Sequence, residues 1–280
     1  SMSTLNVDKV DPNTGTTLEL GTSGDTINIP SGVTIANAGT ATGFGVALTG
    51  STDNQVTTVT GANAIQGEAK LLFSSASLTV GNATAEDSKI IFDGNAQDYH
   101  IGIEDSSDDF VIGNNGFSTK CIVINDSAIV TKPNQPAFLA NSSASQTITN
   151  ATNTTIVFAS EILDRNNDFD GTSTFTAPVT GLYAFSSQVV ADAGGGSDTR
   201  FSEARIKFIA SNRTAQIYHG DLETNADDRM GLSGAVFIDM DASDTLTIEA
   251  FYSRFGASGS VDTIFDANTM YTFLTGYLIC

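Results

Sequence analysis

The sequence predicts an all-β protein. Hydrophobic residues make up 40% of the chain and charged residues only 16%, so Ser, Thr and Asn must supply much of the polar surface. Such residues suit strands and turns better than exposed helices. The 26 glycines punctuate short apolar runs, which alternate with period two. Because no segment shows a convincing helical period, we expect strands throughout.

Residues 1–63 are predicted to form an extended, intertwined β-rich stalk segment. From Ser3 to about Val46, short runs place only two apolar side chains on one face, as Leu18 with Leu20 and Ile27 with Ile29. Such thin faces need neighbouring copies to bury them. From Ala36 to about Asn63 the composition shifts to Ala, Gly, Thr and Asn, which indicates a linker or a segment wound around partners.

Residues 64–132 are predicted to form a small all-β module. Turn signals such as Gly81-Asn82 and Asp93-Gly94 separate most of its strand candidates. The candidates are residues 71–73, 77–80, 89–92, 99–103, 109–112, 121–124 and 128–130.

Residues 133–280 are predicted to form a second all-β domain. Pro133 and Pro136 disfavour both helix and central strand, so they mark the domain boundary. The strand candidates that follow, several of them long and alternating, favour a sandwich or a jelly roll. They are residues 137–140, 154–158, 172–176, 181–190, 202–209, 214–218, 232–239, 245–252 and 271–279.

The stretch Phe175–Phe185 combines a proline bend, a Thr-Gly turn and a new strand that begins Gly181-Leu-Tyr183-Ala-Phe185. With Phe158, Asp164 and Phe169 upstream, it resembles the signature of the C1q/TNF-like domain. The interval from Phe169 to Phe175 is one residue short, and Ser187 stands where a final aromatic is common. The closing segment Phe273-Leu-Thr-Gly-Tyr277-Leu-Ile279 resembles the last strand of that family.

This resemblance implies a ten-stranded jelly roll that forms a trimeric head, with aromatics of the last strand near the threefold axis. The residues it assigns to the trimer or the core are Phe158, Phe169, Phe175, Tyr183, Phe185, Phe273 and Tyr277.

The N-terminal half is similar to tail-fibre-like structural proteins of marine bacteriophages. The segments that carry this weaker resemblance are Asp11–Leu20, Leu48–Ser51, Thr57–Ala62 and Lys89–Asp98. The resemblance implies a virion protein that is assembled in the host cytoplasm and contacts other virion proteins through its N-terminus.

The charge of −20 excludes the electrostatic footprint of a nucleic-acid binder. No run approaches a membrane span, and none resembles a signal peptide. The two cysteines, Cys121 and Cys280, show no metal-ligand spacing, and a buried free thiol is expected at Cys121.

No metal site and no catalytic site is expected. One acidic loop places hard oxygen ligands as in part of a Ca²⁺ loop; they are Asp164, Asn166, Asp168 and Asp170. However, Phe169 stands where such a loop requires glycine, and Phe175 stands where it requires the bidentate Glu. A turn capped by Asp and Asn is therefore favoured, and Ca²⁺ remains a possibility.

A second acidic turn is interpreted in the same way; it contains Glu104, Asp105, Asp108 and Asp109. The only histidines, His100 and His219, belong to no nucleophile motif. With 32 acidic residues, accidental carboxylate pairs give no signal for glycosidic cleavage.

Two glycine-rich loops between strong strands are candidate ligand surfaces, although an unconstrained surface loop is the simpler interpretation. Their candidate residues are Asp192, Asp198, Phe255 and Ser258.

Together these features predict a non-enzymatic homotrimeric phage fibre whose head binds a bacterial surface receptor, either a glycan or a protein. A head or neck decoration without receptor binding is the first alternative, and a polysaccharide depolymerase is the second.

Overall fold

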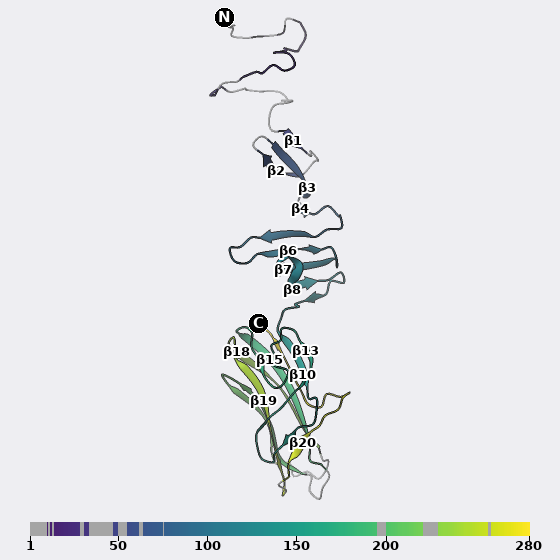
Figure 1. The fold of residues 1–280 in the computed structure, drawn as a ribbon, viewed down its shortest axis with the longest axis vertical. Helices are drawn as coiled ribbons and strands as arrows, with labels where there is room; N and C mark the ends of the chain where they lie inside the picture. The colour runs from purple at the N-terminus through teal and green to yellow at the C-terminus, as the bar shows by residue number, and fades with distance from the viewer. Residues whose placement is uncertain are drawn as a thin grey trace. The chain divides into compact units, whose positions relative to one another are not determined.

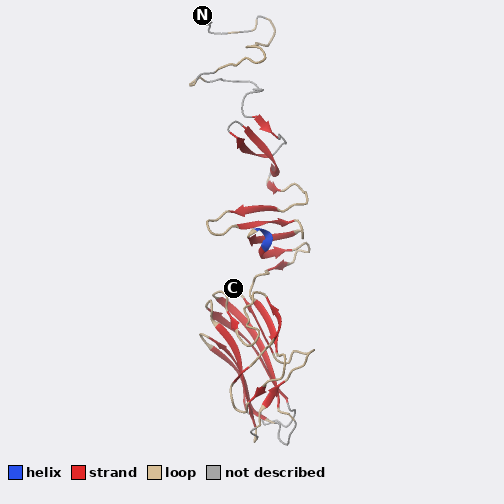
Figure 2. Cartoon of the chain, in the orientation of Figure 1, coloured by secondary structure: helices blue, strands red, loops and turns tan. Residues whose placement is uncertain are grey.

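The computed structural model describes residues 10, 12, 14–28, 31–33, 47–49, 55–61, 64–74, 76–194, 200–220, 229–256 and 259–280. The chain divides into two compact units, Ser1–Ala69 and Lys70–Cys280. The described residues are almost entirely strand, turn and loop, with one short 3-10 helix, η1 (Gly116–Ser118) (Figures 1 and 2). The all-β prediction is therefore confirmed. None of the described helices is long and apolar enough to cross a membrane.

The described residues before β1 contain no strand. Leu18, Leu20, Ile27 and Val33 are all exposed, with Leu20 at 62%. The expected runs that contain Leu18 with Leu20 and Ile27 with Ile29 are therefore not strands where the structure describes them; Ile29 lies outside the described residues. The physical reason is that two apolar side chains per run bury too little surface to order a strand within one chain.

A first sheet has four strands in the order β1-β3-β2, with β4 paired to β3. β1 is parallel to β3, and β3 is antiparallel to β4. The side chains of β4 are all exposed, so this sheet has no core layer behind it there. The strands are β1 (Ala47–Thr49), β2 (Gln55–Gly61), β3 (Ala64–Ser74) and β4 (Ser77–Val80).

A second sheet is a five-stranded antiparallel meander in the order β5-β6-β7-β8-β9. All seven strands expected between residues 64 and 132 are present, counting β3 and β4. The turns that separate the meander strands carry the Asn, Asp and Gly residues that favour tight turns. The strands are β5 (Ser88–Phe92), β6 (Tyr99–Glu104), β7 (Asp109–Asn114), β8 (Thr119–Ile124) and β9 (Val130–Thr131).

The remaining strands form two facing sheets, which we call the head (Figure 2). Its first sheet has the order β11-β20-β15-β21-β10-β13, with β18 paired to β15. The strands are β10 (Ala137–Asn141), β11 (Thr147–Ile148), β13 (Ser160–Asp164), β15 (Gly181–Asp192), β18 (Arg229–Met240), β20 (Val261–Thr263) and β21 (Phe273–Leu278).

The second head sheet has the order β12-β19-β16-β17, with β14 paired to β19. The chain moves from one sheet to the other after each of the strands from β11 to β15 and again after β17, β18 and β19, and its first and last strands, β10 and β21, are neighbours. This connectivity is a jelly roll. The strands are β12 (Thr154–Thr155), β14 (Phe175–Thr176), β16 (Phe201–Ala210), β17 (Thr214–Gly220) and β19 (Thr245–Arg254).

The head core lies between the two sheets and consists of one contiguous cluster of buried side chains. Phe138 stacks on Phe169 and Phe175, with ring centroids 5.1 and 5.0 Å apart. Gly276 lies against this cluster, because a Cβ there would stand 2.5 Å from the Phe185 ring and 2.8 Å from that of Phe138. The close approach of these rings explains a glycine in the middle of the last strand.

The nine strands expected in the head are present, but three are shorter than expected and three further strands were not expected. Residues 154–158, 172–176 and 271–279 contain β12, β14 and β21, each ending within the expected run. The additional strands β11, β13 and β20 have two to five residues. Such short strands carry little alternation of their own and are specified by their partners across the sheet.

Candidate functional site

The described ends of the two glycine-rich loops predicted as ligand surfaces meet at one end of the head. The guanidinium of Arg200 lies over the Phe255 ring, 4.4 Å from its centroid, and the Phe255 amide donates 2.9 Å to the Arg200 carbonyl. This contact joins the strand that follows one loop to the start of the other. Asp198 and Ser258 lie outside the described residues.

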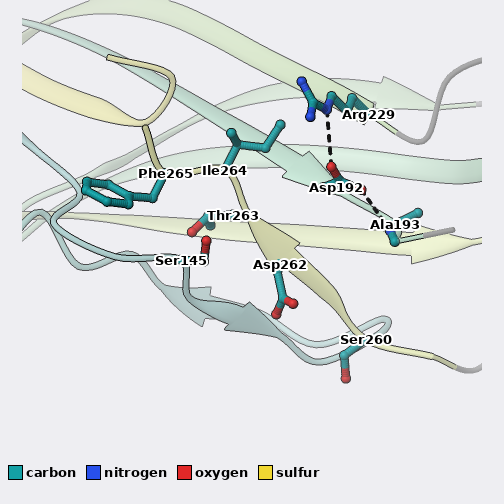
Figure 3. Close-up of a pocket in the computed structure, with 10 residues that line it drawn as sticks. Ser145, Asp192, Ala193, Arg229, Ser260, Asp262, Thr263, Ile264 and Phe265 are labelled. Carbon is teal, nitrogen blue, oxygen red and sulfur yellow. Dashed lines mark hydrogen bonds and ion pairs between the residues drawn. The ribbon is translucent and has the colours of Figure 1, made fainter. Parts of the chain in front are cut away.

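A pocket of about 410 Å³ opens beside Asp192, at the end of β15 (Figure 3). It is lined by Ser145, Asp192, Ala193, Gly194, Arg229, Ser260, Asp262, Thr263, Ile264 and Phe265. Of the predicted ligand residues, Asp192 lines this pocket. Phe255 does not line it, but it lies five residues before Ser260, which does. Ala193 and Gly194 follow Asp192 in the same predicted loop. The other lining residues come from β18, from β20 with its flanking segments, and from the segment before β11, none of which the sequence patterns singled out.

The pocket is built on one polar row that runs across four strands. Arg229 on β18 faces Asp192 on β15, Asp192 faces Asp262 on β20, and Asp262 faces Thr147 on β11. Two carboxylates that lie directly opposite each other on neighbouring strands repel, so each needs its own donor.

Those donors are present in the structure. Arg229 Nε lies 3.1 Å from Asp192 Oδ2, and the Gly194 amide donates 2.8 Å to Asp192 Oδ1. The Thr147 hydroxyl donates 2.7 Å to Asp262 Oδ1.

Several polar groups of the pocket keep hydrogen-bonding capacity. Arg229 is engaged with Asp192 through Nε, which leaves its two terminal nitrogens facing solvent on a side chain that is 58% exposed. The second carboxylate oxygen of Asp262 and the hydroxyls of Ser145 and Ser260 also have no partner among the described residues. The Phe265 ring, 39% exposed, adds an apolar wall. This combination suits a hydroxyl-rich or amide-bearing ligand that has one apolar face.

The candidate Ca²⁺ loop is closed by its own backbone. Asp164 accepts hydrogen bonds from the amides of Asn166, Asp168 and Phe169 at 3.3, 3.1 and 2.9 Å. Asp170 Oδ1 accepts three more, from the amides of residues 172 to 174 at 2.8 to 3.0 Å. Both carboxylates therefore act as turn caps, the interpretation that the sequence favoured, and the described residues contain no group of three or more His, Cys, Asp or Glu suited to a metal.

The electrostatics of this loop differ between its two later carboxylates. Burial on its own raises the pKa of Asp170, but hydrogen bonds from the Thr174 amide, the Thr172 side chain and the amides of Ser173 and Thr172 outweigh it and lower the pKa to about 2. At Asp168, burial and then the neighbouring Asp164 raise the pKa. Asp168 Oδ2 is buried without a hydrogen-bond partner, in agreement with a carboxyl that binds its proton more tightly.

The second acidic turn and the histidines form no shared site. Lys120 binds Glu104 and lies 3.9 Å from Asp109, so these carboxylates are paired. His100 is buried on β6, where burial and then Lys89 lower its pKa. His219 lies exposed on β17, in a different sheet.

The residues assigned to the trimer or the core fall into two groups. Five are buried within the single chain, namely Phe158, Phe169, Phe175, Tyr183 and Phe185. The other two, Phe273 and Tyr277, lie on the outer face of β21, where Tyr277 is 53% exposed. The cysteines are free thiols; Cys121 is half-buried rather than fully buried, and Cys280 is exposed.

No protein-family model matches the sequence, and no curated protein matches it. Among solved structures, the chain is similar to the globular domain of zebrafish complement 1qA protein, with 19% identity and a TM-score of 0.36 over 52% of this chain and 98% of that one. It is also similar to murine APRIL, with 11% identity and a TM-score of 0.35 over 52% and 99% of the two chains. A third similar structure is Eiger TNF from S. frugiperda, with 12% identity and a TM-score of 0.35 over 52% and 91%.

Proposed function

We propose that the chain is the subunit of a trimeric phage fibre whose head binds a bacterial surface receptor, and that the pocket beside Asp192 contributes to the contact. The observation that carries this proposal is the placement of the pocket at the far end of β15. Gly181, at the other end of that strand, lies beside the C-terminal Cys280. Eleven residue steps of β-strand separate the two ends by roughly 35 Å.

The chain enters the head at the end away from the pocket. The first head strand, β10, pairs with the last, β21, and Ala137 faces Tyr277. The amide of Leu278 donates 3.0 Å to the carbonyl of Pro136. A receptor that contacts the pocket therefore approaches the end of the head that is distant from its attachment, as an adhesion tip requires.

The outer face of the first head sheet supports association with further copies. Tyr277, Ala184 and Phe237 are cross-strand neighbours on β21, β15 and β18, and Phe237 is 70% exposed. Most of the adjoining outward positions are uncharged; the exceptions are Asp239, which is paired with Arg213, and Arg229 with Asp192 at the pocket end. The uncharged positions are Ala137, Leu139, Asn141, Leu182, Ser186, Gln188, Val190, Gly231, Ser233, Ala235, Phe273 and Thr275. In a chain of charge −20, a broad face with few charges, each of them paired, is where copies approach with least repulsion.

Association into a trimer gives adhesion its strength. Three copies present three pockets on one head, and each binding event after the first becomes intramolecular. Shallow pockets that bind weakly alone then hold a cell surface firmly, especially when many fibres act together. This mechanism needs no catalytic group and no cofactor.

Two measurements on the purified full chain test the proposal. Light scattering coupled to size-exclusion chromatography gives the mass, and three times 29.1 kDa is expected. Fluorescently labelled protein is then incubated with intact cells of candidate marine bacterial hosts and with a glycan array, where saturable binding to one host or one glycan class is expected. A monomeric mass would overturn the proposed trimer. A trimer that binds no cell and no glycan would overturn receptor binding and favour a structural decoration of the virion. Release of reducing ends from host polysaccharide would favour the depolymerase instead.

A further inference from the structure

Four isoleucines form one row across the β5–β9 sheet. Ile90 faces Ile101, Ile101 faces Ile112, and Ile112 faces Ile122, each on the neighbouring strand. Directly opposed residues of an antiparallel sheet point to the same side, so all four side chains share one face.

The same register extends this row into an apolar face, which we call the isoleucine face. Ile103, Phe110, Ile124 and Val130 form the next row, and Phe92 with Tyr99 lies on the other side. No charged side chain interrupts these positions. The isoleucine face is made by Ile90, Phe92, Tyr99, Ile101, Ile103, Phe110, Ile112, Ile122, Ile124 and Val130.

The opposite face of the sheet is the charged one, and its central part is covered by the chain itself. The salt-bridged Lys120 and Glu104 lie on that side, and the Phe117 ring of η1 contacts the buried His100 at 4.6 Å. Val111 and Val123 are also buried there, at 0% and 7% exposure. In a monomeric protein, the apolar face of such a sheet is normally covered and the charged face is exposed to solvent. In the β5–β9 sheet the fully buried residues lie on the charged face, and the apolar face is the more exposed one.

The exposed area of the isoleucine face is large. Six of its residues are 37 to 60% exposed, the lowest being Ile112 and the highest Phe92. With fully exposed areas on the order of 150–250 Å² per side chain, these six alone leave roughly 500 Å² of apolar surface. That approaches the ~800 Å² that each partner contributes to a stable protein interface, and the half-buried residues of the face add to it.

We infer that the isoleucine face is covered by the same face of further copies of this chain, so that the β5–β9 sheets form a shared apolar core in the assembled fibre. An uncharged face cannot select a foreign partner by charge complementarity. An apolar face is, however, complementary to the same apolar face of a second copy. The segment between β9 and β10 is only five residues, Lys132–Pro136, so associated heads hold their β5–β9 sheets at high effective concentration. The inference rests on the proposed trimer for the number of copies.

Ile90 and Ile91 provide a matched test, because they are neighbours on β5 that point to opposite faces. Ile90 lies on the isoleucine face at 45% exposure, and Ile91 lies on the charged face at 55%. Both Ile90→Cys and Ile91→Cys are made in a full-length background that carries Cys121→Ala and Cys280→Ser. The rate of reaction with a soluble thiol reagent and the mass in solution are then measured on the same samples.

The expected result is a trimeric mass for both variants, with Cys at position 90 reacting at least about tenfold more slowly than Cys at position 91, because its reaction requires local opening of the assembly. A trimer in which the two thiols react at equal rates overturns this inference and leaves the proposed head trimer intact. A monomer with equal rates overturns both.

A charge placed at the same two positions gives an independent readout. Ile90→Glu is expected to increase hydrogen exchange of the β6 and β7 amides in the full-length trimer, and Ile91→Glu is expected to leave it near the parent level. Both side chains are exposed in the single chain, so neither substitution disturbs the fold of one copy by burying a charge. Equal exchange in the two variants contradicts the inference.

Discussion

The hydroxyl of Tyr183 donates a hydrogen bond of 2.7 Å to the carbonyl oxygen of Val179, four residues earlier in the chain. The bond spans the bend that leads from β14 into β15 and fixes the entry angle of β15, one of the two longest strands of the head. Phe175 packs edge-on against Tyr183, with ring centroids 5.5 Å apart, so the aromatic cluster and the hydrogen bond hold the same corner. The tyrosine corner of β-sandwich domains works in the same way.

Replacement of Tyr183 by Phe tests how much this bond contributes. The ring and its packing are retained, while the Val179 carbonyl loses its donor, so a loss of about 1–2 kcal/mol in the free energy of unfolding is expected. Urea unfolding followed by circular dichroism measures it. Tyr218→Phe is the control, because Tyr218 is 60% exposed on β17. An equal effect in the two variants would contradict a role for the bond.

Much of this corner is predictable from the sequence, since Pro178, Gly181 and the alternating Tyr183 and Phe185 specify a bend followed by a strand. A sandwich or a jelly roll was likewise expected from the alternation of the long strands, and the family resemblance implied the jelly roll. The short strands β11, β13 and β20 were not, since two to five residues are specified by partners distant in the chain. Only part of the pocket was predictable. Asp192 lies in a glycine-rich loop that the sequence shows, but its pairing with Asp262 and Arg229 depends on the register between strands.

The sequence also predicted thin apolar faces before residue 46 but not the isoleucine face. Strands β5 to β8 each contribute two or three apolar residues to it and β9 contributes one, and many of the remaining positions are apolar as well, as in Cys121-Ile-Val-Ile124. Sequence alternation alone therefore cannot tell which side is covered. The register and the position of Phe117 decide it.

Asp170 is expected to stabilise the loop after β13 in a pH-dependent manner. Its pKa is lowered to about 2 in the folded chain from an ordinary 3.8, so its stabilising effect is complete above pH 3.8 and is lost as the pH falls through about 2. Because the side chain is exposed, solvent screening limits the effect to about 1 kcal/mol, similar to other capping residues.

The test compares Asp170→Ala with the parent by urea unfolding at pH 7 and pH 2. A difference of about 1 kcal/mol at pH 7 that shrinks at pH 2 is expected. Asp126→Ala is the control, because Asp126 accepts a hydrogen bond from the adjacent Ser127 hydroxyl rather than from three backbone amides. A difference that grows on acidification would show that the caps do not act through the ionised carboxylate.

Tyr277→Asp is expected to disrupt assembly while leaving the head folded. Tyr277 is 53% exposed in the single chain, so the substitution disturbs no core packing there, but it places an unpaired charge among the uncharged residues of the outer face. Burial of that face would lose an aromatic contribution on the order of 1.5–3 kcal/mol per copy, with the cost of a buried charge added. Light scattering should report a smaller mass, while circular dichroism stays unchanged.

Tyr218→Asp serves as the control for assembly, since Tyr218 is equally exposed but lies on β17, in the other head sheet. It should keep the parent mass. If Tyr277→Asp also remains a trimer of unchanged stability, copies do not meet through the outer face of β21.

The pocket row gives a prediction that separates binding from assembly. Arg229→Gln removes the cation beside Asp192 and leaves the Asp192 and Asp262 carboxylates without charge compensation between them. Arg229 is 58% exposed, so the head should stay folded and trimeric, with a change in stability below about 1 kcal/mol. Because the proposed trimer presents three pockets, a modest loss of affinity at each pocket multiplies. Cell binding by the labelled protein should therefore fall by about tenfold or more.

Arg213→Gln is the matched control, because Arg213 also forms an exposed ion pair, with Asp239 at 2.6 Å, but lies outside the pocket. Binding that falls equally in both variants would point to a general effect of surface charge. Binding that falls in neither, with the parent protein still binding cells, would place the receptor contact elsewhere on the head. Only a selective loss in Arg229→Gln, at unchanged mass, assigns the contact to the row of Arg229, Asp192 and Asp262.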